Sequence, residues 1–334
     1  MVFANNDRPG IMLASAARLF LNQYGVAVGR KVGVYTANDS AYAAAIDLKR
    51  AGVDVPVIVD TRESPSSAVI DEARSLGIEV LTGYAVYSAG GKRRVSSISI
   101  KPNNGGNERK IVVDAVIMSA GWTPSVHLFS QSRGKVAWDA PNERFVPGTY
   151  AQDCVSVGAC NGTDSLQAAI DEAVAAGGGK ANAITATGGT NWIAGMIGSA
   201  PGAGADTTVK AFVDFQNDVT AKDVRLAVRE GMHSIEHIKR FTTNGMATDQ
   251  GKTSNLHGLA IAAEALDKPI PAVGLTTFRA PFTPVTFGAI VNHARHDLFD
   301  PTRRTPMHAW HEAQGAPFED VGQWKRAWYY PQAG

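Results

Sequence analysis

The sequence predicts an α/β fold in which a parallel sheet precedes a small helical domain. Three observations lead to this prediction. Short β-rich runs alternate with helical runs between residues 30 and 83, a Gly- and Ala-rich stretch covers residues 178–206, and purely helical periodicity follows it. At 334 residues the chain is long enough for about two domains, each with its own core.

The first half of the chain has the pattern of consecutive βαβ units. Residues 5–25 begin with a turn-rich stretch and then predict one helix, with no leading strand. Beyond it, strands are expected at residues 30–36, 54–61 and 78–83, and helices at residues 38–52 and 65–77. Because short strands alternate with helices, these strands are expected to be parallel, with right-handed crossovers.

Two later segments predict further strands. Residues 93–121 predict two strands around an Asn- and Gly-rich hairpin turn, and then a buried strand. Residues 153–179 predict a buried strand, a tight turn and a helix that stops at a glycine run. Both segments extend the α/β pattern to about residue 178.

The second half predicts a compact helical module. A Thr-x-x-Asp capping box opens the helix at residues 220–231, and further helices are expected at 234–241 and 255–268. We therefore divide the chain into a partial dinucleotide-binding-like domain (1–178), a Gly/Ala-rich linker (179–207), the helical module (208–268) and an irregular segment (269–334).

Composition narrows the class of protein. Apolar residues make up 44% and charged residues 19% of the chain, as in soluble globular proteins, and the net charge of +1 predicts no nucleic-acid or anionic-membrane surface. No apolar run approaches the roughly 20 residues that span a bilayer. The two cysteines, Cys154 and Cys160, predict a reducing, cytoplasmic setting, and we expect both as small buried residues.

The turn after the first of the three strands at residues 30–83 resembles a dinucleotide-binding turn with its glycines replaced. In "TANDSA", Thr36, Asn38 and Ala41 stand at the glycine positions of G-x-G-x-x-G. Asp60, at the end of the next strand, stands where a ribose-binding acid is usual. The pattern predicts a Rossmann-like unit whose own cofactor site is lost or much altered. Thr36, Asn38 and Asp60 are its candidate cofactor residues.

A second turn has the form of a flavoprotein reductase turn. "SAGWTP" has the Gly-x-x-Pro spacing that returns the chain to the first domain in two-dinucleotide reductases. In "GACNG", Gly158 is followed by Ala159, whereas those reductases carry an aspartate that binds the flavin ribityl chain. An alanine methyl group cannot accept that hydrogen bond, which argues against FAD in this chain. Gly158 remains a candidate contact for a nicotinamide dinucleotide.

The loop "NGMATDQGKTSN" (244–255) resembles a metal-binding loop without thiolates. Laid on the Cys-x-Cys and Cys-x4-Cys spacing of bacterioferritin-associated ferredoxin modules, the chain places Asp214, Gln216, Asp249 and Ser254 at the ligand positions. These side chains are poor ligands for an iron–sulfur cluster, so we predict a cluster-free module of this type and no metal.

Part of the same loop fits an anion site. Lys252, Thr253 and Ser254 directly precede a predicted helix, whose free N–H groups and dipole favour phosphate. The alternative is ordinary capping of this helix by Ser254 or Asn255.

The remaining polar and aromatic residues define no catalytic site. The pairs His233/His237 and His308/His311 lack the further ligands of a zinc motif, and no Ser-His-Asp arrangement can be assigned, so we predict no catalytic residue. The Arg- and aromatic-rich stretches "FRAPFTPVTFGA" and "WKRAWYYP" predict either a subunit contact or irregular chain packed on a domain.

Several of these stretches together resemble one family. "NDRPGIMLASAARLFLNQYG", "VYTANDSAYAAAIDLKRAG" and "EHIKRFTTNGMATDQGKTSN" are similar to the middle part of the alpha subunit of heterotetrameric sarcosine oxidase, and the last of them is highly specific. The C-terminal "RRTPMHAWHEAQGAPFEDVGQWKRAWYYP" resembles the first strand and turn of that subunit's folate-binding aminomethyltransferase domain. The related N-methylglutamate, opine and proline dehydrogenase subunits share the architecture.

The resemblance implies a reaction, a set of cofactors and partner subunits. The family oxidises sarcosine to glycine, passes the methyl carbon to tetrahydrofolate and reduces oxygen to hydrogen peroxide. It implies NAD bound mainly through a segment before Met1, FMN at the subunit interface, FAD in the beta subunit and tetrahydrofolate in a domain after Gly334. The partners would be the beta, gamma and delta subunits. From the loop geometry, and not from any family motif, Lys252, Thr253 and Ser254 are our candidates for contact with the FMN phosphate.

The same comparison implies that the chain is a fragment that is inactive alone, with an exposed sheet edge where a first strand is missing. A second hypothesis is a non-catalytic interaction fragment, or a subunit of a related N-methylglutamate or opine dehydrogenase complex. A third, an independent NAD(P)H-dependent reductase, requires an intact glycine motif and a ribityl-binding aspartate. Neither "TANDSA" nor "GACNG" supplies these, so the third hypothesis ranks last.

Overall fold

The computed structural model describes residues 1–179, 185–186, 209–280 and 283–332. Almost all of the predicted linker at 179–207 therefore lies outside the described residues. The chain forms two compact units, residues 1–282 and residues 283–334. Within the described residues, no helix combines the length and the apolar character needed to cross a membrane.

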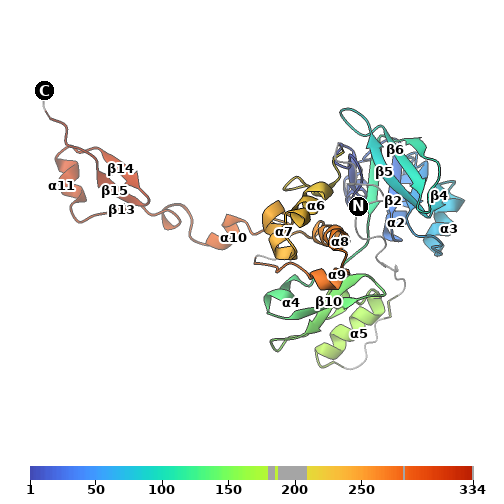
Figure 1. The fold of residues 1–334 in the computed structure, drawn as a ribbon. Coiled ribbons are helices and arrows are strands. Elements are labelled where there is room, and N and C mark those ends of the chain that lie inside the picture. The colour runs from blue at the N-terminus through green and yellow to red at the C-terminus, as the bar shows by residue number, and fades with distance from the viewer. Residues whose placement is uncertain (180–184, 187–208, 281–282, 333–334) are drawn as a thin grey trace. The chain divides into compact units, whose positions relative to one another are not determined.

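A five-stranded parallel sheet forms the centre of the first unit (Figure 1). Its order is β1 (Ile11–Leu13), β8 (Ala115–Ser119), β2 (Val32–Thr36), β3 (Val57–Asp60) and β4 (Glu79–Thr82). Every neighbouring pair in this sheet is parallel, which confirms the predicted α/β class.

Strand β1 corrects the prediction that residues 5–25 contain a helix and no leading strand. Helix α1 (Ala14–Tyr24) starts only after three extended residues, which pair with β8 from Ile11↔Val116 to Leu13↔Met118. Strand β1 therefore covers one edge of β8. The apolar run Ile11–Leu13 continues directly into the helical pattern, so local periodicity does not mark the boundary.

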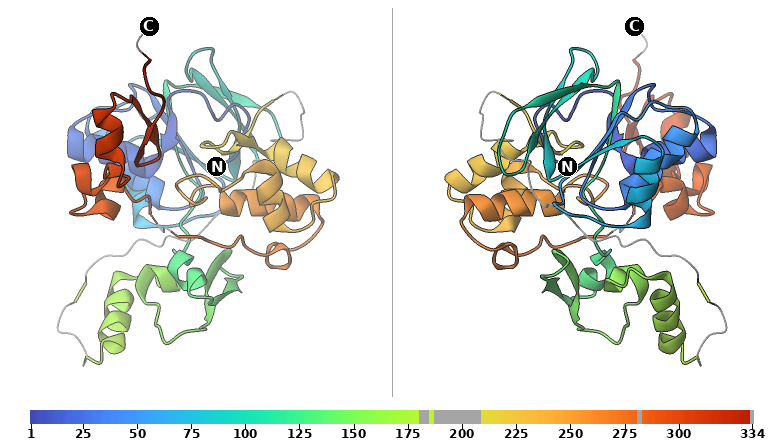
Figure 2. Two further views of the ribbon diagram at one scale, coloured as in Figure 1. Left: turned by 90° about the vertical axis from the view of Figure 1, so that its left-hand side faces the viewer. Right: turned by 90° about the vertical axis from the view of Figure 1, so that its right-hand side faces the viewer.

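Each face of the parallel sheet has its own cover. Helices α1, α2 (Ser40–Arg50) and α3 (Ala68–Ser75) pack on one face, and the antiparallel strands β5 (Tyr84–Gly90), β6 (Ser97–Pro102) and β7 (Arg109–Val112) cover the other (Figure 2). Successive strand residues point to opposite faces. Accordingly Val34 packs with the helices and Tyr35 with the antiparallel strands.

The chain between β8 and the helical module differs in part from the prediction. Helix α4 (His127–Gln131) precedes the hairpin β9 (Lys135–Asp139) and β10 (Arg144–Thr149), and α5 (Leu166–Ala176) confirms the predicted helix. The buried strand expected after residue 153 is wrong. No strand of the described residues pairs with this stretch, and Cys154 and Val155 are exposed. Its apolar alternation alone resembled a strand.

The buried Arg144 joins β10 to the turn that follows it. Its Nη1 donates to Asp164 Oδ1 at 2.9 Å, its Nη2 donates to the Gly162 carbonyl at 2.6 Å, and its Nε donates to Asp139 Oδ2 at 3.3 Å. The turn includes a 3-10 helix at Gly158–Asn161. A buried guanidinium with three polar partners thus fixes this turn in the absence of the predicted strand.

The three helices predicted after residue 220 form, and two short strands that were not predicted precede them. The helical module contains β11 (Phe212–Asp214), β12 (Val219–Thr220), α6 (Ala221–Arg229), α7 (Ile235–Thr242), α8 (Asn255–Ala265) and α9 (Ile270–Val273). Thr220 and Asp223 form the reciprocal capping box at the start of α6. Buried Val224, Ile238 and Leu259 join the three longer helices in one core.

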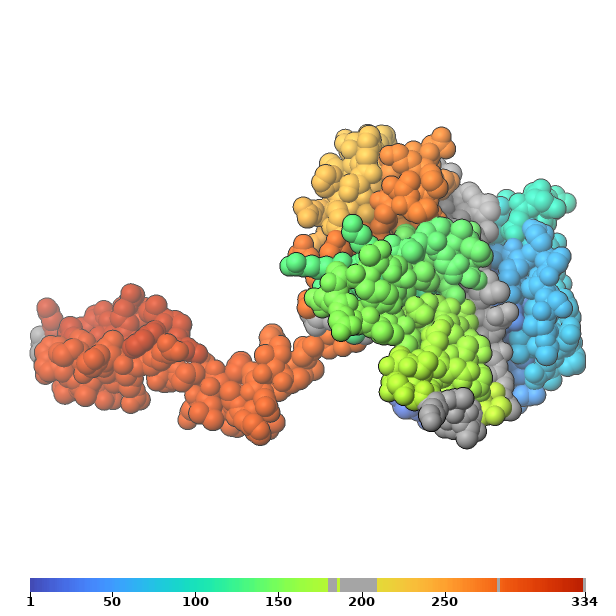
Figure 3. Space-filling view, turned by 90° about the horizontal axis from the view of Figure 1, so that it is seen from below, coloured from blue at the N-terminus to red at the C-terminus, as the bar shows by residue number. Residues whose placement is uncertain are grey.

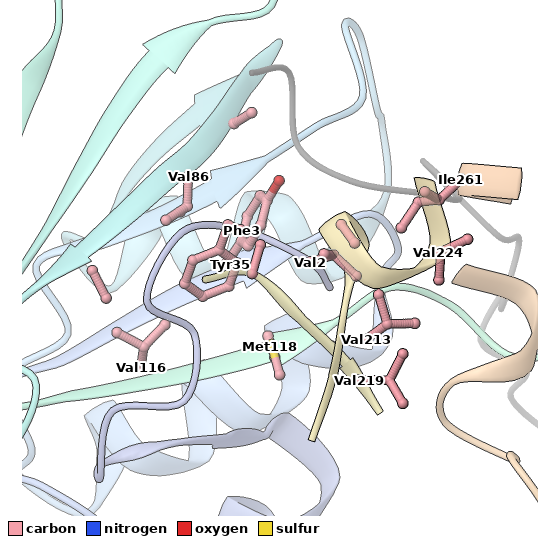
Figure 4. Close-up of a cluster of buried hydrophobic side chains, with 14 of the residues drawn as sticks. Val2, Phe3, Tyr35, Val86, Val116, Met118, Val213, Val219, Val224 and Ile261 are labelled. Atoms are coloured by element: carbon pink, nitrogen blue, oxygen red, sulfur yellow. The ribbon is translucent and has the colours of Figure 1, made fainter. Parts of the chain in front are cut away.

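The N-terminal segment connects the sheet to the helical module (Figure 4). Phe3 is fully buried and packs edge-on against Tyr35, with ring centroids 5.7 Å apart. The Asn6 side chain pairs with the backbone of Phe212 in both directions, through Nδ2 to the carbonyl at 2.8 Å and through Oδ1 from the N–H at 2.7 Å. The apolar core and these hydrogen bonds make the sheet and the module one structure.

The second unit is small. The segment predicted to be irregular contains α10 (Phe287–Val291), a 3-10 turn at His296–Leu298, α11 (His308–Ala313) and three short strands, β13 (Arg303–Arg304), β14 (Phe318–Val321) and β15 (Trp324–Ala327). The strands form a sheet in the order β13-β15-β14. Regular structure in this second unit begins at Phe287, and the segment predicted to be irregular, 269–334, also contains α9 of the first unit.

We expect Phe3→Ala to lower the free energy of unfolding of the first unit by about 3–5 kcal/mol, because it leaves a cavity in a close-packed core. Phe20→Ala, on the exposed side of α1, is the matched control and should cost less than about 1 kcal/mol. Chemical denaturation followed by circular dichroism measures both. Equal losses for the two variants would show that Phe3 does not join the sheet to the module.

Candidate functional site

A cavity of about 370 Å³ lies at the carboxyl edge of the parallel sheet. Its walls come from Met1, the residues after β1 and β8, the start of α2, Glu143, and the loop that leads into α8 together with the first turn of that helix. The lining includes Ser40, Ser119, Trp122, His127, Lys252 and Thr253. The cavity is thus shared between the α/β sheet and the helical module.

The topology of the sheet explains why a cavity forms there. From β2 the chain passes through α2 to β3 on one side, whereas β8 pairs with β2 on the other side. Open α/β sheets bind ligands where the strand order reverses in this way, outside the carboxyl ends of the strands. Ser40 and Ser119 line the cavity at this point, with their Oγ atoms 3.0 Å apart.

The loop 244–255 brings two of its three predicted anion-binding residues to the cavity. Lys252 and Thr253 line it, and the Thr253 hydroxyl donates to Asp249 Oδ2 at 3.3 Å. Ser254 lies beside them at the N-cap of α8 and is 1% exposed. Its Oγ is buried and makes no hydrogen bond within the described part of the chain.

The start of α8 has the electrostatics of an anion site. Capping by Ser254, the alternative to this site, does not occur, because its side chain accepts no bond from the helix. The other alternative, Asn255, instead donates from Nδ2 to the Gln250 carbonyl at 3.1 Å. Helix N–H groups without a side-chain cap carry a partial positive charge. Lys252 adds a cation to the lining. Arg18 also lines the cavity but is paired with Asp47 at 2.7 Å, and Glu143 is a lining carboxylate.

His127 also lines the cavity. Its ring packs on Phe278 with centroids 3.8 Å apart, where the segment from α4 to β10 (green) abuts the helical module (yellow to orange) in Figure 3. Burial, together with the nearby charge of Lys252, lowers the pKa of His127 to about 4, and Asp249 opposes this shift. The imidazole is therefore neutral at neutral pH and can donate or accept a hydrogen bond.

Sequence reasoning did not identify Trp122 and His127 as site residues. Both follow β8, in the stretch "SAGWTPSVH" whose spacing we related to a chain return between domains. Their position just after a predicted buried strand could have identified them, because ligand sites in parallel sheets lie at the carboxyl ends of the strands.

Thr36 and Asn38, predicted as cofactor contacts, are both fully buried beneath the cavity floor and do not line it. Thr36 Oγ1 donates to the Asn38 carbonyl at 2.7 Å. Asn38 Nδ2 donates to Ser119 Oγ at 2.9 Å, and Asn38 Oδ1 accepts the Ser40 N–H at 2.9 Å. The turn therefore links β2, β8 and α2 through its own polar groups.

Asp60, the predicted ribose acid, lies at the end of β3 with no exposed surface. Tyr42 donates its hydroxyl to Asp60 Oδ2 at 2.8 Å, and Arg62 donates to both carboxylate oxygens. Asp60 does not line the cavity.

Gly158 and the cysteines lie outside the cavity as well. Gly158 adopts φ +68° and donates its N–H to Glu172 Oε2 at 2.7 Å. Bonds from Thr163 and Gly158 lower the pKa of Glu172. Cys154 is exposed, which contradicts the expected burial, and Cys160 is partly exposed, with its Sγ 3.1 Å from the Val157 carbonyl.

At three of the four presumed ligand positions, Asp214, Gln216 and Asp249, the side chain accepts hydrogen bonds from the chain itself, whereas Ser254 Oγ makes none among the described residues. Asp214 Oδ2 accepts the Gly245 N–H at 2.7 Å, and its Oδ1 accepts the N–H groups of Gln216 and Asn217. Gln216 accepts from Thr248 at 3.1 Å, and Asp249 accepts the Gly251 N–H at 3.0 Å. Among the described residues, no three His, Cys, Asp or Glu side chains gather as a metal site.

We expect Asp214→Ala to destabilise the first unit by about 1–3 kcal/mol, because it leaves the buried Gly245 N–H without its acceptor. Asp214→Asn retains one acceptor oxygen, so its loss should be smaller. Chemical denaturation of both variants measures the difference. A loss below about 0.5 kcal/mol for Asp214→Ala would mean that this carboxylate does not hold the loop.

His127 should make stability depend on pH. Its pKa falls from 6.5 to about 4 on folding, so between these values the unfolded chain binds a proton that the folded chain excludes. Stability is complete above about pH 6.5 and falls on acidification, by up to about 1.4 kcal/mol per pH unit. His127→Gln should remove this slope, whereas His233→Gln, on an exposed residue, should retain it. Equal slopes for both variants would contradict the shift.

Comparison with known proteins gives one consistent result. The chain is 40% identical over its whole length to sarcosine oxidase subunit alpha from Corynebacterium sp. (strain P-1), and 39% identical to that from Rhizobium meliloti (strain 1021). It spans 36% and 34% of the length of these relatives. Residues 208–293, which include the loop 244–255, match the model of the sarcosine oxidase A3 domain.

A solved structure supports the fold. The crystal structure of L-proline dehydrogenase from P. horikoshii matches with a TM-score of 0.59 and 20% identity, over 87% of this chain and 56% of that chain. At this identity the match concerns the fold alone. The sequence matches are closer, and by them the chain is homologous, over its whole length, to part of sarcosine oxidase subunit alpha.

Proposed function

We propose that the chain is the electron-transfer and scaffold portion of the alpha subunit of a sarcosine oxidase-type complex. The complex would oxidise sarcosine to glycine, pass the methyl carbon to tetrahydrofolate and reduce oxygen to hydrogen peroxide. The observation that carries the proposal is the 40% identity along the entire chain. The chain would contribute structure and a cofactor contact, with the oxidation of the amine in the beta subunit.

FMN is the cofactor that the cavity fits. The cavity is mostly apolar, contains Trp122, and has Lys252, Thr253 and the start of α8 at one wall, which suits a planar ring system with a phosphate. When bound, FMN accepts and passes on electrons. In this chain Lys252 would neutralise the phosphate charge. Thr253 would donate its hydroxyl, and Ser254 Oγ is a further polar group beside the helix start.

The other cofactors and partners rest on the family resemblance. FAD would lie in the beta subunit and tetrahydrofolate in a folate-binding domain of the alpha subunit, and NAD would bind mainly through residues outside this chain. The beta, gamma and delta subunits would be the partners, in the cytoplasm. The cluster-free, ferredoxin-type module would serve the subunit interface, with Asp214 and Gln216 holding its loop in place of thiolates.

Exposed aromatic side chains support a role in subunit contact. In the second unit Phe287 is 82% and Trp328 68% exposed, and Tyr329 and Tyr330 beside Trp328 are also exposed. Aromatic residues are enriched in interface cores, and isolated surfaces seldom display so many. The same observation favours the second candidate function, a non-catalytic interaction fragment that holds a partner.

Lys252→Ala in the assembled complex tests the FMN contact. Loss of a charge-assisted hydrogen bond to phosphate should weaken FMN binding about 10- to 100-fold, while riboflavin, which lacks the phosphate, should bind as before. Flavin release on dilution, measured by fluorescence, gives both affinities. Lys268→Ala removes the same charge beyond the far end of α8 and is the control. Unchanged FMN occupancy in Lys252→Ala would reject the contact.

A further inference from the structure

We propose that the crevice between α2 and β3 is closed to nicotinamide dinucleotides by the chain's own side chains, with Arg62 as the internal counter-ion of Asp60. In a dinucleotide-binding fold this crevice receives the adenosine ribose and the pyrophosphate. The proposal concerns the start of α2 and the end of β3, of which Ser40 also lines the cavity, and it does not depend on the proposed function.

The ribose position is occupied from within. A ribose-binding acid must offer free carboxylate oxygens to a hydroxyl group. Asp60 Oδ1 accepts hydrogen bonds from the backbone N–H of Arg62 at 3.0 Å and from its side-chain Nε at 3.1 Å. Asp60 Oδ2 accepts hydrogen bonds from Arg62 Nη2 and from the Tyr42 hydroxyl, both at 2.8 Å. With four donors on two fully buried oxygens, Asp60 has no capacity left for a ribose.

The pyrophosphate position is occupied as well. A pyrophosphate binds to free N–H groups at the start of the helix after the first strand. Here the first N–H of α2, at Ser40, donates to Asn38 Oδ1, and the Ser40 hydroxyl donates to the same oxygen. Asp39, 6% exposed, adds a negative charge at the helix start, where it repels phosphate.

Arg62 closes the crevice by bridging both positions. Its Nη2 donates to Asp39 Oδ1 at 2.7 Å as well as to Asp60. The hydrogen bonds and charges of these carboxylates outweigh burial and raise the pKa of Arg62. Burial and the neighbouring Asp60 raise the pKa of Tyr42, so its hydroxyl remains a donor. Two buried carboxylates thus share one guanidinium, and an entering phosphate would have to displace them.

The turn at Gly158 is also satisfied by a side chain of the chain itself. The N–H of Gly158, which a flavin or dinucleotide turn would offer to its ligand, binds the Glu172 carboxylate. Both turns of this chain that have the form of cofactor sites are therefore satisfied internally. Ser40 and Ser119 nevertheless line the cavity at the carboxyl edge of the sheet.

Hydrogen exchange of the assembled complex with and without NADH at about 1 mM tests the closure directly. We expect the amides of residues 36–42 and 60–62 to exchange equally in both samples, wherever else the complex binds NADH. Protection of the Ser40 amide by NADH would overturn the proposal, because that N–H is free only if Asn38 has been displaced.

Variants of the chain test the internal contacts. Arg62→Gln and Tyr42→Phe should each lower the Tm by several degrees, whereas Arg109→Gln, which removes an exposed ion pair with Glu79, should shift it by less than about one degree. Tyr42→Phe keeps the buried ring and is the milder variant if Arg62→Gln fails to fold. No change in Tm for Tyr42→Phe would overturn the role assigned to these contacts.

Discussion

The two hydrogen bonds between the Asn6 side chain and the backbone of Phe212 connect the two halves of the first unit. An amide side chain buried at 1% exposure is costly unless its donor and acceptor are both satisfied, and the Phe212 backbone satisfies both. On one side of Asn6, Ala4 pairs with β5 through hydrogen bonds to Tyr87 and Ala89. The N-terminal segment is thus held by β5 and by β11, and the helical module takes its position from this segment.

The cavity depends on that position through a short chain of contacts. Strand β11 ends at Asp214, whose carboxylate holds the loop 244–255 at Gly245. The loop ends at the start of α8 and carries Lys252 and Thr253 to the carboxyl edge of the sheet. A site shared by two structural parts needs both held rigidly, since small displacements separate groups that must act on one ligand. Asn6 and Asp214 supply that rigidity outside the cavity lining.

Local signals in the sequence predicted most of the regular structure, and pairing between distant residues accounts for the errors. Strands β2, β3 and β4, helices α2 and α3 and the capping box of α6 follow from runs of neighbouring residues. Strand β1 has three residues, and it becomes a strand because β8, more than a hundred residues later, provides its partner. The stretch after residue 153 shows the opposite case. Its apolar and polar residues alternate as in a strand, but no described strand pairs with it, so it forms none.

The cavity was partly predictable, since Lys252 and Thr253 precede a helix. Trp122 and His127 reach it only through tertiary packing.

The turns with the form of cofactor sites share one physical constraint. A turn shaped to present N–H groups or a carboxylate to a ligand cannot leave those groups buried and unpaired when no ligand contacts them. In this chain Arg62 and Tyr42 bind Asp60, Asn38 binds the start of α2, Glu172 binds Gly158, and Asp214 binds the loop at Gly245. The loop of the helical module therefore needs no metal to keep its shape, because carboxylate and amide oxygens accept its N–H groups.

The last residues of the loop 244–255 differ from the cofactor-type turns described above. Ser254 Oγ is buried without a hydrogen bond in the described chain, and the start of α8 has no side-chain cap. Among these turns and loops, the loop 244–255 retains polar groups that a ligand can satisfy, and it is the loop that reaches the cavity.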